Sequence, residues 1–318
     1  MSFCVMALTD DRLDVIKKFV AYYLDQGADR ISLYFDNPDS KLIKKFNHLD
    51  RVECHRCTED FLKGLRRYLD HAGPAQNSIA TFAYNNLQED WLVRVDIDEY
   101  MHFPGRKIED VLAQQPKSTE VFRPPVAEML NTKKKNGALY FRKKMNAETV
   151  RNIYGDELDL AMQAQQGLAG HVESKVAIRK GLKNTVVMEH EPFQMSWFER
   201  NYKQFQQQWI RRKRYHEVQT EDGYLLHLNN EPFEIWSSKI VWRSELKSIS
   251  PQMSRGFLSY FLNIASSKKS MTVEKALKQL YSRIFDFDQS RLNALKKAGA
   301  LLELDLSLDV LVRRYFKD

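Results

Sequence analysis

Three carboxylates stand within four positions at the end of an apolar run. The run is WLVRV, residues 91–95, and the acids that follow it are Asp96, Asp98 and Glu99. The apolar residues predict a buried strand, on which residues i and i+2 point to the same face. Asp96 and Asp98 would then share a face, where two carboxylates repel each other unless a cation joins them.

The spacing of Asp96 and Asp98 suits a divalent metal. Mg²⁺ and Mn²⁺ prefer oxygen ligands, and they bind through a few protein carboxylates together with substrate phosphates. We therefore expect Mn²⁺ or Mg²⁺ beside a phosphorylated substrate. Acids that are merely solvated or salt-bridged are the alternative, because D-x-D alone is a common pattern. Glu99 would point to the opposite face, so we expect it to anchor the loop.

Strands and helices alternate along the segment that leads to these acids. Apolar spacing and turn residues predict strands in residues 3–8, 30–37 and 51–57, and helices in residues 12–29, 42–49, 61–72 and 74–90. Such alternation is typical of a parallel α/β sheet, whose ligands bind at the carboxyl ends of the strands. Asp36 and the acids after residue 95 both follow strands, so we expect a site there.

Beyond residue 105 the alternation loosens, and beyond residue 195 the chain is predicted to be mostly helical. Residues 118–130 read as a strand with a double proline, and residues 171–192 as two short strands joined by a glycine turn. Helical spacing recurs in residues 197–218, 255–266, 273–285 and 289–300. We predict a catalytic domain in residues 1–195 and a helical C-terminal region, residues 196–318, that completes the acceptor side.

Four segments resemble a bacterial family-2-like group of glycosyltransferases with the GT-A fold. DWLVRVDIDEYMHF resembles the D-x-D-E-[FY] segment of that group, and ALTDDRLDVIKKFVAYYLDQGADRISLYFDNPDS resembles its opening segment. PAQNSIATFAYNN resembles the helix before the metal strand, and HVESKVAIRKG with VVMEHEP resembles a later segment. The resemblance covers roughly residues 3–195. It implies a GT-A-like fold with a mostly parallel central sheet.

The resemblance implies a metal site and a donor site. The metal would be held by Asp96, Asp98 and His190, of which Asp98 would be a direct ligand. Contacts with the substrates are implied for the following residues: Asp36 at the nucleoside, Asp96 at the ribose, Lys175 and Arg179 at the donor phosphates or the acceptor, and His171 at the donor or acceptor. The family often carries Lys-Asn-Glu after its first strand, where this chain has Thr9-Asp10-Asp11. Two roles are therefore open for Asp10: it contacts the donor, or it only caps the helix that follows.

The chemistry of sugar transfer calls for a cation and a base. A divalent cation stabilises the charge that builds on the departing diphosphate, and an acidic side chain accepts the proton of the acceptor hydroxyl. Sequence alone does not choose among four candidate bases, which are Glu128, Asp156, Glu189 and Glu191. Family resemblance favours inversion at the anomeric carbon, and base rates favour a UDP-sugar donor.

Composition sets the expected partners and location. The net charge of +7 suits an anionic partner, and the cluster of Arg211, Arg212, Lys213 and Arg214 suits a membrane surface or a lipid-linked acceptor, although it also complements a helix end. No nucleic-acid recognition motif occurs, so we expect no nucleic-acid partner. Three cysteines, no signal-like N-terminus and no apolar span predict a cytoplasmic protein, with peripheral contact at the inner membrane surface left open.

We therefore expect a metal-dependent transferase that moves a sugar from a nucleotide-sugar to an acceptor hydroxyl in glycan or polysaccharide assembly. One alternative is a metal-dependent nucleotidyltransferase, which also needs paired acids but usually carries a glycine-rich phosphate loop. Another is a binding module for nucleotide-sugars without catalytic activity.

Overall fold

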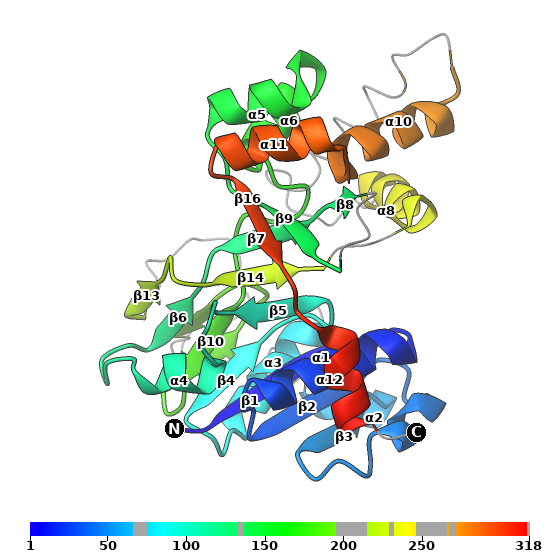
Figure 1. Cartoon of the computed structure of the whole chain (residues 1–318). Coiled ribbons are helices and arrows are strands. Elements are labelled where there is room, and N and C mark those ends of the chain that lie inside the picture. Colours follow the sequence, from blue (N-terminus) through cyan, green and yellow to red (C-terminus); the bar gives the residue numbers. More distant parts are fainter. Residues whose placement is uncertain are drawn as a thin grey trace. The chain divides into compact units, whose positions relative to one another are not determined.

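The computed structural model describes residues 1–65, 75–132, 137–194, 215–228, 232–245, 266 and 271–316. The chain forms two compact units, each assembled from segments that are distant in sequence (Figure 1). Unit 1 comprises residues 1–125, 173–225 and 307–318, and unit 2 comprises residues 126–172 and 226–306. The division at residue 195 expected from the sequence concerns functional regions, and it stays a prediction.

Unit 1 is built on a seven-stranded sheet with the order β13-β6-β10-β4-β1-β2-β3. Its strands are β1 (Phe3–Thr9), β2 (Arg30–Phe35), β3 (Val52–Arg56), β4 (Trp91–Arg94), β6 (Val121–Arg123), β10 (Val176–Arg179) and β13 (Glu217–Gln219). β3, β2, β1 and β4 are mutually parallel, and β13 is parallel to β6, whereas β10 runs antiparallel to both of its neighbours. The expectation of an α/β protein with a mostly parallel sheet is confirmed.

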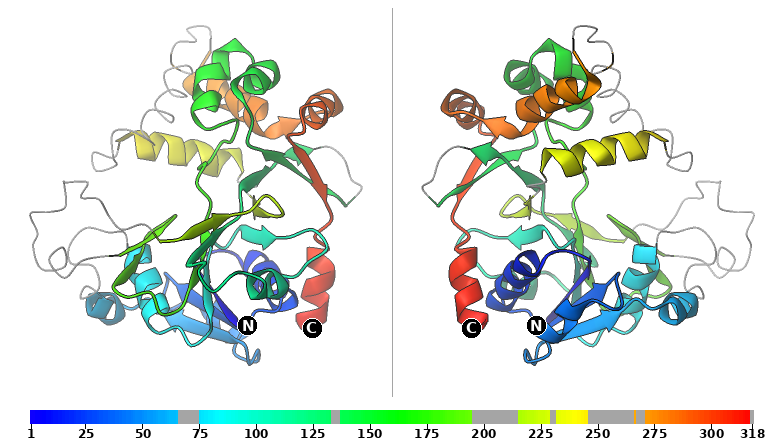
Figure 2. Two further views of the ribbon diagram at one scale, coloured as in Figure 1. Left: turned by 90° about the vertical axis from the view of Figure 1, so that its left-hand side faces the viewer. Right: turned by 90° about the vertical axis from the view of Figure 1, so that its right-hand side faces the viewer.

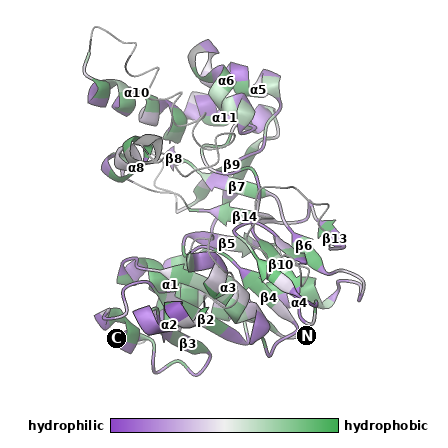
Figure 3. Ribbon diagram, turned by 180° about the vertical axis from the view of Figure 1, so that it is seen from behind, coloured by the Kyte–Doolittle hydropathy of each residue, from purple (hydrophilic) through white to green (hydrophobic). Residues whose placement is uncertain are grey.

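Helices cover both faces of this sheet. They are α1 (Leu13–Asp25), the 3-10 helix η1 (Lys41–Lys45), α2 (Glu59–Leu65), α3 (Ala75–Asn85), α4 (Ile108–Ala113) and α12 (Leu308–Tyr315). Cys4 and Met6 of β1 pack against Ile79 and Ala80 of α3. The alternate residues of β1 face the other side of the sheet, where α1 and α12 lie (Figure 2). The central strands are accordingly mostly hydrophobic (Figure 3).

The start of α1 differs from the expectation. The N-cap residue is Arg12, and it makes no side-chain capping hydrogen bond. Asp11 instead accepts a hydrogen bond from the Arg12 amide at 2.7 Å, so neither Asp10 nor Asp11 caps the helix. The helix ends at Asp25, two residues before Gly27, which has a φ of +90° that L side chains rarely adopt.

The stretch 91–103 is not one continuous strand. β4 ends at Arg94, a turn follows, and β5 (Glu99–His102) begins at the third acid. The turn is closed by a hydrogen bond of 3.0 Å from the Glu99 amide to the Asp96 carbonyl. Asp96 and Asp98 therefore lie in a turn, and the same-face argument for an extended strand does not apply to them.

Unit 2 combines a small antiparallel sheet with helices. Its elements are β7 (Val126–Met129), β8 (Asn131–Thr132), β9 (Leu139–Lys143), α5 (Ala147–Tyr154), α6 (Asp156–Ala164), α8 (Phe233–Glu245), α10 (Val273–Phe285), β15 (Asp286–Phe287), α11 (Gln289–Lys297) and β16 (Leu301–Leu304). β9 pairs antiparallel with β7 and β16, and β15 pairs with β8. Apolar residues from α5, α6, α8, α10 and α11 share one core.

Several remaining expectations can be compared with these elements. The helices expected in residues 273–285 and 289–300 correspond to α10 and α11. The expected helices in residues 197–218 and 255–266 fall almost wholly outside the described residues. Within the part of the chain that is described, no helix combines the length and apolar composition needed to cross a bilayer.

Candidate functional site

The strand order of unit 1 creates a switch point between β1 and β4. From β1 the chain goes outward to β2 and β3, and it then returns to β4 on the other side of β1. In open α/β sheets such a point leaves a crevice at the carboxyl ends of the strands, where ligands bind. Asp10 follows β1, Asp36 follows β2 and Asp96 follows β4 closely, so three of the candidate residues lie at this edge.

Two backbone hydrogen bonds hold this edge together. The Asp36 amide donates to the Thr9 carbonyl at 3.0 Å, and the Val95 amide donates to the Met6 carbonyl at 3.2 Å. Asp10 and Asp36 are exposed, and Asp96 is partly exposed. The carboxylates that sequence reasoning selected on separate strands are therefore presented to solvent along one edge of the sheet.

Asp96 is paired with a buried lysine. The Nζ atom of Lys175 lies 2.8 Å from Oδ2 of Asp96, and the exposed fractions of the two side chains are 2% and 48%. Lys175 directly precedes β10, whose antiparallel register places Val176 opposite Arg94. Because a buried ammonium is costly without a counter-charge, this pair is a fixed feature of the site.

Glu99 anchors the turn that carries Asp96 and Asp98, as the sequence led us to expect. Its side chain is 7% exposed, and Oε2 accepts a hydrogen bond of 2.8 Å from the Asp96 amide. Its carbonyl accepts a hydrogen bond of 2.9 Å from the Tyr23 hydroxyl of α1. Burial raises the pKa of the Tyr100 hydroxyl, and the negative charges of Asp98 and Asp11 raise it further.

A buried arginine supplies a second cation. Arg94, the last residue of β4, is 3% exposed, and its Nη1 donates to the carbonyl of Glu189. Burial lowers the pKa of the Arg94 guanidinium, while the charges of Asp96, Glu189 and Glu99 oppose that effect. Asp96 therefore lies among positive charges that the protein itself provides.

A second arginine, Arg123, holds the loop that carries His190. The strands β11 (Thr185–Val187) and β12 (Pro192–Gln194) form a hairpin whose loop contains Glu189, His190 and Glu191. Nη1 of Arg123, at the end of β6, donates to the carbonyl of His190 at 2.8 Å and to the carbonyl of Ser174. The peptide before Lys175 and the peptide after His190 are thus fixed by one side chain.

The residues at this edge were tested for their fit to a divalent metal. Asp96 and Asp98 share a partly exposed turn, which suits an ion completed by substrate phosphates. Among the described residues, no three His, Cys, Asp or Glu side chains gather as a group that could hold a metal ion. The two carboxylates fit a site shared with a ligand, whereas a preformed trio with His190 is not assembled.

Arg179 is not at this edge. Because β10 is antiparallel to β4, Arg179 pairs with Trp91 at the amino end of β4, while Val176 pairs with Arg94 at the carboxyl end. Its guanidinium lies 4.2 Å from the centre of the Trp91 ring and donates to the carbonyls of Thr119 and Pro116. The expected contact of Arg179 with donor phosphates is therefore not supported, and we leave Arg179 out of the proposed site.

Three other candidate residues belong to unit 2. Asp156 and His171 are exposed, at the start of α6 and in the segment after it. Glu128 is 1% exposed, lies 2.8 Å from Nη2 of Arg142 and accepts hydrogen bonds from the amides of Ala169 and Gly170. A carboxylate enclosed in this way does not suit a general base, so Glu128 is left out of the proposed site. Arg211, Arg212, Lys213 and Arg214 lie outside the described residues.

Sequence reasoning missed Arg94 and Arg123. The signal for Arg94 was present, because a charged residue in the apolar run WLVRV must find partners when the strand is buried. Arg123 precedes the double proline at the end of its strand, and nothing in its neighbourhood indicates the two carbonyls that it holds.

Comparison with known proteins yields no family. No family model and no curated protein matches the chain. Among solved structures, HddC from Yersinia pseudotuberculosis aligns at 9% identity and a TM-score of 0.35, covering 76% of this chain and 100% of that one. The bifunctional glycosyltransferase WbbM aligns at 11% identity and a TM-score of 0.28, covering 39% of this chain and 23% of that one. Likeness at this level carries no argument about activity.

Proposed function

We propose that the chain is a glycosyltransferase of the GT-A type, which moves a sugar from a nucleotide-sugar, favoured as a UDP-sugar, to an acceptor hydroxyl. The observation that carries the proposal is the meeting of Asp10, Asp36 and Asp96 at the switch point, with Lys175 against Asp96. Crevices at such points bind nucleotides in other α/β sheets. The sequence resemblance of residues 3–195 supports the same reaction.

Each residue at this edge has a proposed task. Asp36 and Asp10 bind the nucleoside, and the buried ammonium of Lys175 faces the diphosphate. Asp96 and Asp98 would hold Mn²⁺ or Mg²⁺ together with the substrate phosphates, and His190 would be a further ligand once the ion is bound. When bound, such an ion stabilises negative charge on the departing diphosphate. Lys175 and Arg94 add to that stabilisation, because fixed cations in a partly dry site act strongly on developing charge.

Glu189 and Glu191 are the proposed bases. Both are exposed, and both flank His190 in the loop between β11 and β12. A carboxylate there can accept the proton of an acceptor hydroxyl. Inversion at the anomeric carbon is proposed from the sequence resemblance. The acceptor is a glycan or a lipid-linked glycan, which links the reaction to polysaccharide assembly. Location in the cytoplasm, with the basic segment 211–214 at a membrane surface, is part of the same proposal.

Ligand-induced thermal stabilisation tests the proposal. UDP, GDP and CDP are each added with and without Mn²⁺, and the unfolding midpoint is measured. One nucleotide, UDP, is expected to raise the midpoint more with Mn²⁺ than without it. If a nucleotide stabilises the protein equally with and without Mn²⁺, the proposed metal dependence is wrong. If none of the three nucleotides stabilises the protein, the proposed nucleotide-sugar donor is wrong. Release of a sugar from the bound donor to water or an acceptor separates a transferase from a binding module.

A further inference from the structure

Arg123 makes an unusual set of contacts for a residue outside the expected site. Nε and Nη2 donate to the two carboxylate oxygens of Glu217 on β13, at 2.8 and 3.1 Å. Nη1 donates to the carbonyls of Ser174 and His190. Its side chain is 14% exposed. The two sides of the guanidinium therefore differ in role: Nε and Nη2 are fixed by the Glu217 carboxylate, and Nη1 holds two backbone carbonyls.

The backbone that Arg123 holds belongs to the segment that carries Lys175, the partner of Asp96, and to the hairpin loop that Arg94 also holds. Ser174 is 2% exposed, and its carbonyl belongs to the peptide bond that begins Lys175. His190 lies in the hairpin loop, one residue after the carbonyl that Arg94 holds. Neither segment pairs with the other as a strand, because β10 pairs with β4 and β6 whereas β11 pairs with β12. Arg123 joins them directly.

We infer that Arg123 is a positioning residue for the anion-binding site, oriented by Glu217, and that it sets the relative placement of Lys175 and His190. The inference rests on the proposed function for the ligand, a nucleoside diphosphate. A planar guanidinium offers donors in a fixed fork, whereas an ammonium is a point charge on a flexible stem. Lysine in place of Arg123 keeps the charge but cannot hold Glu217 in a fork and two carbonyls at the same time.

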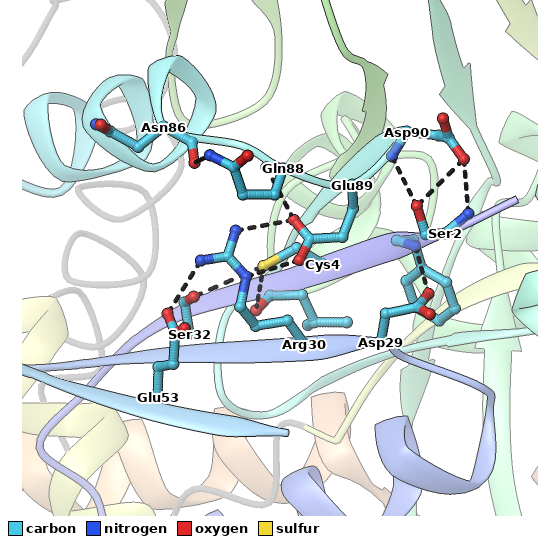
Figure 4. A network of polar contacts seen from close by, with 12 residues as sticks. Ser2, Cys4, Asp29, Arg30, Ser32, Glu53, Asn86, Gln88, Glu89 and Asp90 are labelled. Carbon is cyan, nitrogen blue, oxygen red and sulfur yellow. Dashed lines mark hydrogen bonds and ion pairs between the residues drawn. The ribbon is translucent and has the colours of Figure 1, made fainter. Parts of the chain in front are cut away.

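Unit 1 offers a matched control at the opposite edge of the same sheet. Arg30, the first residue of β2, donates through Nε and Nη2 to both carboxylate oxygens of Glu89 at 2.8 Å, and through Nη1 to Glu53 (Figure 4). Its side chain is 21% exposed. The carboxylate fork is thus the same as that of Arg123, but the third group meets a carboxylate rather than the backbone of the site.

The test compares R123K with R30K in the full-length protein. Binding of UDP with Mn²⁺ is measured by calorimetry, and amide hydrogen exchange is followed in residues 173–176 and 188–191. Both variants are expected to lose some thermal stability. R123K is expected to bind UDP with Mn²⁺ at least tenfold more weakly and to exchange faster in both segments, whereas R30K keeps the wild-type affinity and the wild-type exchange there.

The outcomes separate the inference from the proposed function. Wild-type affinity in R123K, or equal loss in R30K, would overturn the inference while leaving nucleotide binding intact. If the wild-type protein binds no nucleotide, the proposed function fails, and exchange alone decides whether Arg123 holds the two segments. Should R123K fail to fold, E217Q takes its place, because it keeps Arg123 and weakens only its orientation. A smaller loss of affinity with faster exchange is then expected, and no change would overturn the inference.

Discussion

Nζ of Lys175 lies 2.8 Å from Oδ2 of Asp96, and the two members of this pair differ sharply in their access to water. The lysine side chain is 2% exposed, whereas the aspartate side chain is 48% exposed. The positive charge is thus held inside the protein, and the negative charge meets the solvent. The proposed diphosphate would be attracted by this ammonium, and the proposed divalent cation would compete with the ammonium for Asp96.

Replacing Lys175 by Met should separate ligand binding from folding. Asp96 is half exposed, so water can solvate its carboxylate once the ammonium is gone, and the unfolding midpoint should change little. Affinity for UDP in the absence of metal should fall by about tenfold, since a charge-assisted contact to phosphate contributes roughly 1.5–3 kcal/mol.

Lys180→Met is the matched control for this prediction. Lys180 follows the other end of β10, is exposed and donates to the carbonyl of Gln88. The Lys180→Met protein should bind UDP with the wild-type affinity. Calorimetry measures the affinities of Lys175→Met, Lys180→Met and the wild-type protein. If Lys175→Met and the wild-type protein bind UDP with equal affinity, the Lys175 ammonium pairs with Asp96 but does not contribute to UDP binding.

Asp98 and Glu99 are adjacent, yet their removal should have different effects. Asp98→Ala should abolish the part of the UDP-induced thermal shift that depends on Mn²⁺, with little change in the midpoint without ligand. Glu99→Ala removes the acceptor of the Asp96 amide, and an unsatisfied buried donor costs about 1–3 kcal/mol. Its unfolding midpoint should therefore drop before any ligand is added.

The two variants are compared by differential scanning calorimetry with and without Mn²⁺ and UDP. A Mn²⁺-dependent shift that survives in Asp98→Ala would mean that another residue holds the ion. A Glu99→Ala protein as stable as the wild type would mean that the turn does not need its anchor.

The sequence predicted the strands and helices before Asp96 well, because apolar spacing is local and each element has its own turn residues. It did not predict the turn between Arg94 and Glu99. The alternation of polar and apolar residues in Asp96-Ile97-Asp98 is the pattern of a strand, although these residues form a turn. Nor could it indicate which end of β10 faces Asp96. Lys175 and Arg179 differ by one strand length, and only the antiparallel pairing with β4 places the first at the site and the second away from it.

The enclosed pair in unit 2 illustrates the same limit. Glu128 looked like a possible base only because the sequence does not show its partners. Arg142 is fully buried and donates to Glu128, to the hydroxyl of Tyr154 and to the carbonyl of Ile284. These four groups come from separate segments, so their meeting depends on how unit 2 folds.

Breaking the pair of Arg142 and Glu128 should lower the stability of the protein without acting directly on its activity. Arg142→Met leaves the Glu128 carboxylate buried without its counter-ion, which costs about 3–5 kcal/mol. The double variant Arg142→Met with Glu128→Gln removes both charges and keeps an acceptor for one of the amides of Ala169 and Gly170, so it should recover part of the loss. Chemical denaturation measures the three proteins, and equal stability of the single variant and the wild type would contradict the structural role.

The pair of Arg30 and Glu89 should make stability depend on pH. Burial alone would raise the pKa of the Glu89 carboxyl, but the hydrogen bonds and charge of Arg30 outweigh it and lower the pKa below its usual range. A carboxyl with a depressed pKa in the folded state stabilises the protein above the pKa of the unfolded state, and the effect is lost as pH falls through the folded pKa.

Glu89→Gln should therefore lower the unfolding midpoint at pH 7 by an amount that shrinks as the pH falls from 5 towards 3. Glu59→Gln is the control, because Glu59 is exposed and pairs with Lys63 at the surface, at 2.7 Å. Thermal unfolding of the three proteins at each pH gives the comparison. A Glu89→Gln deficit that stays constant down to pH 3 would mean that Arg30 does not hold the carboxyl ionised, because the loss would then come from packing rather than charge.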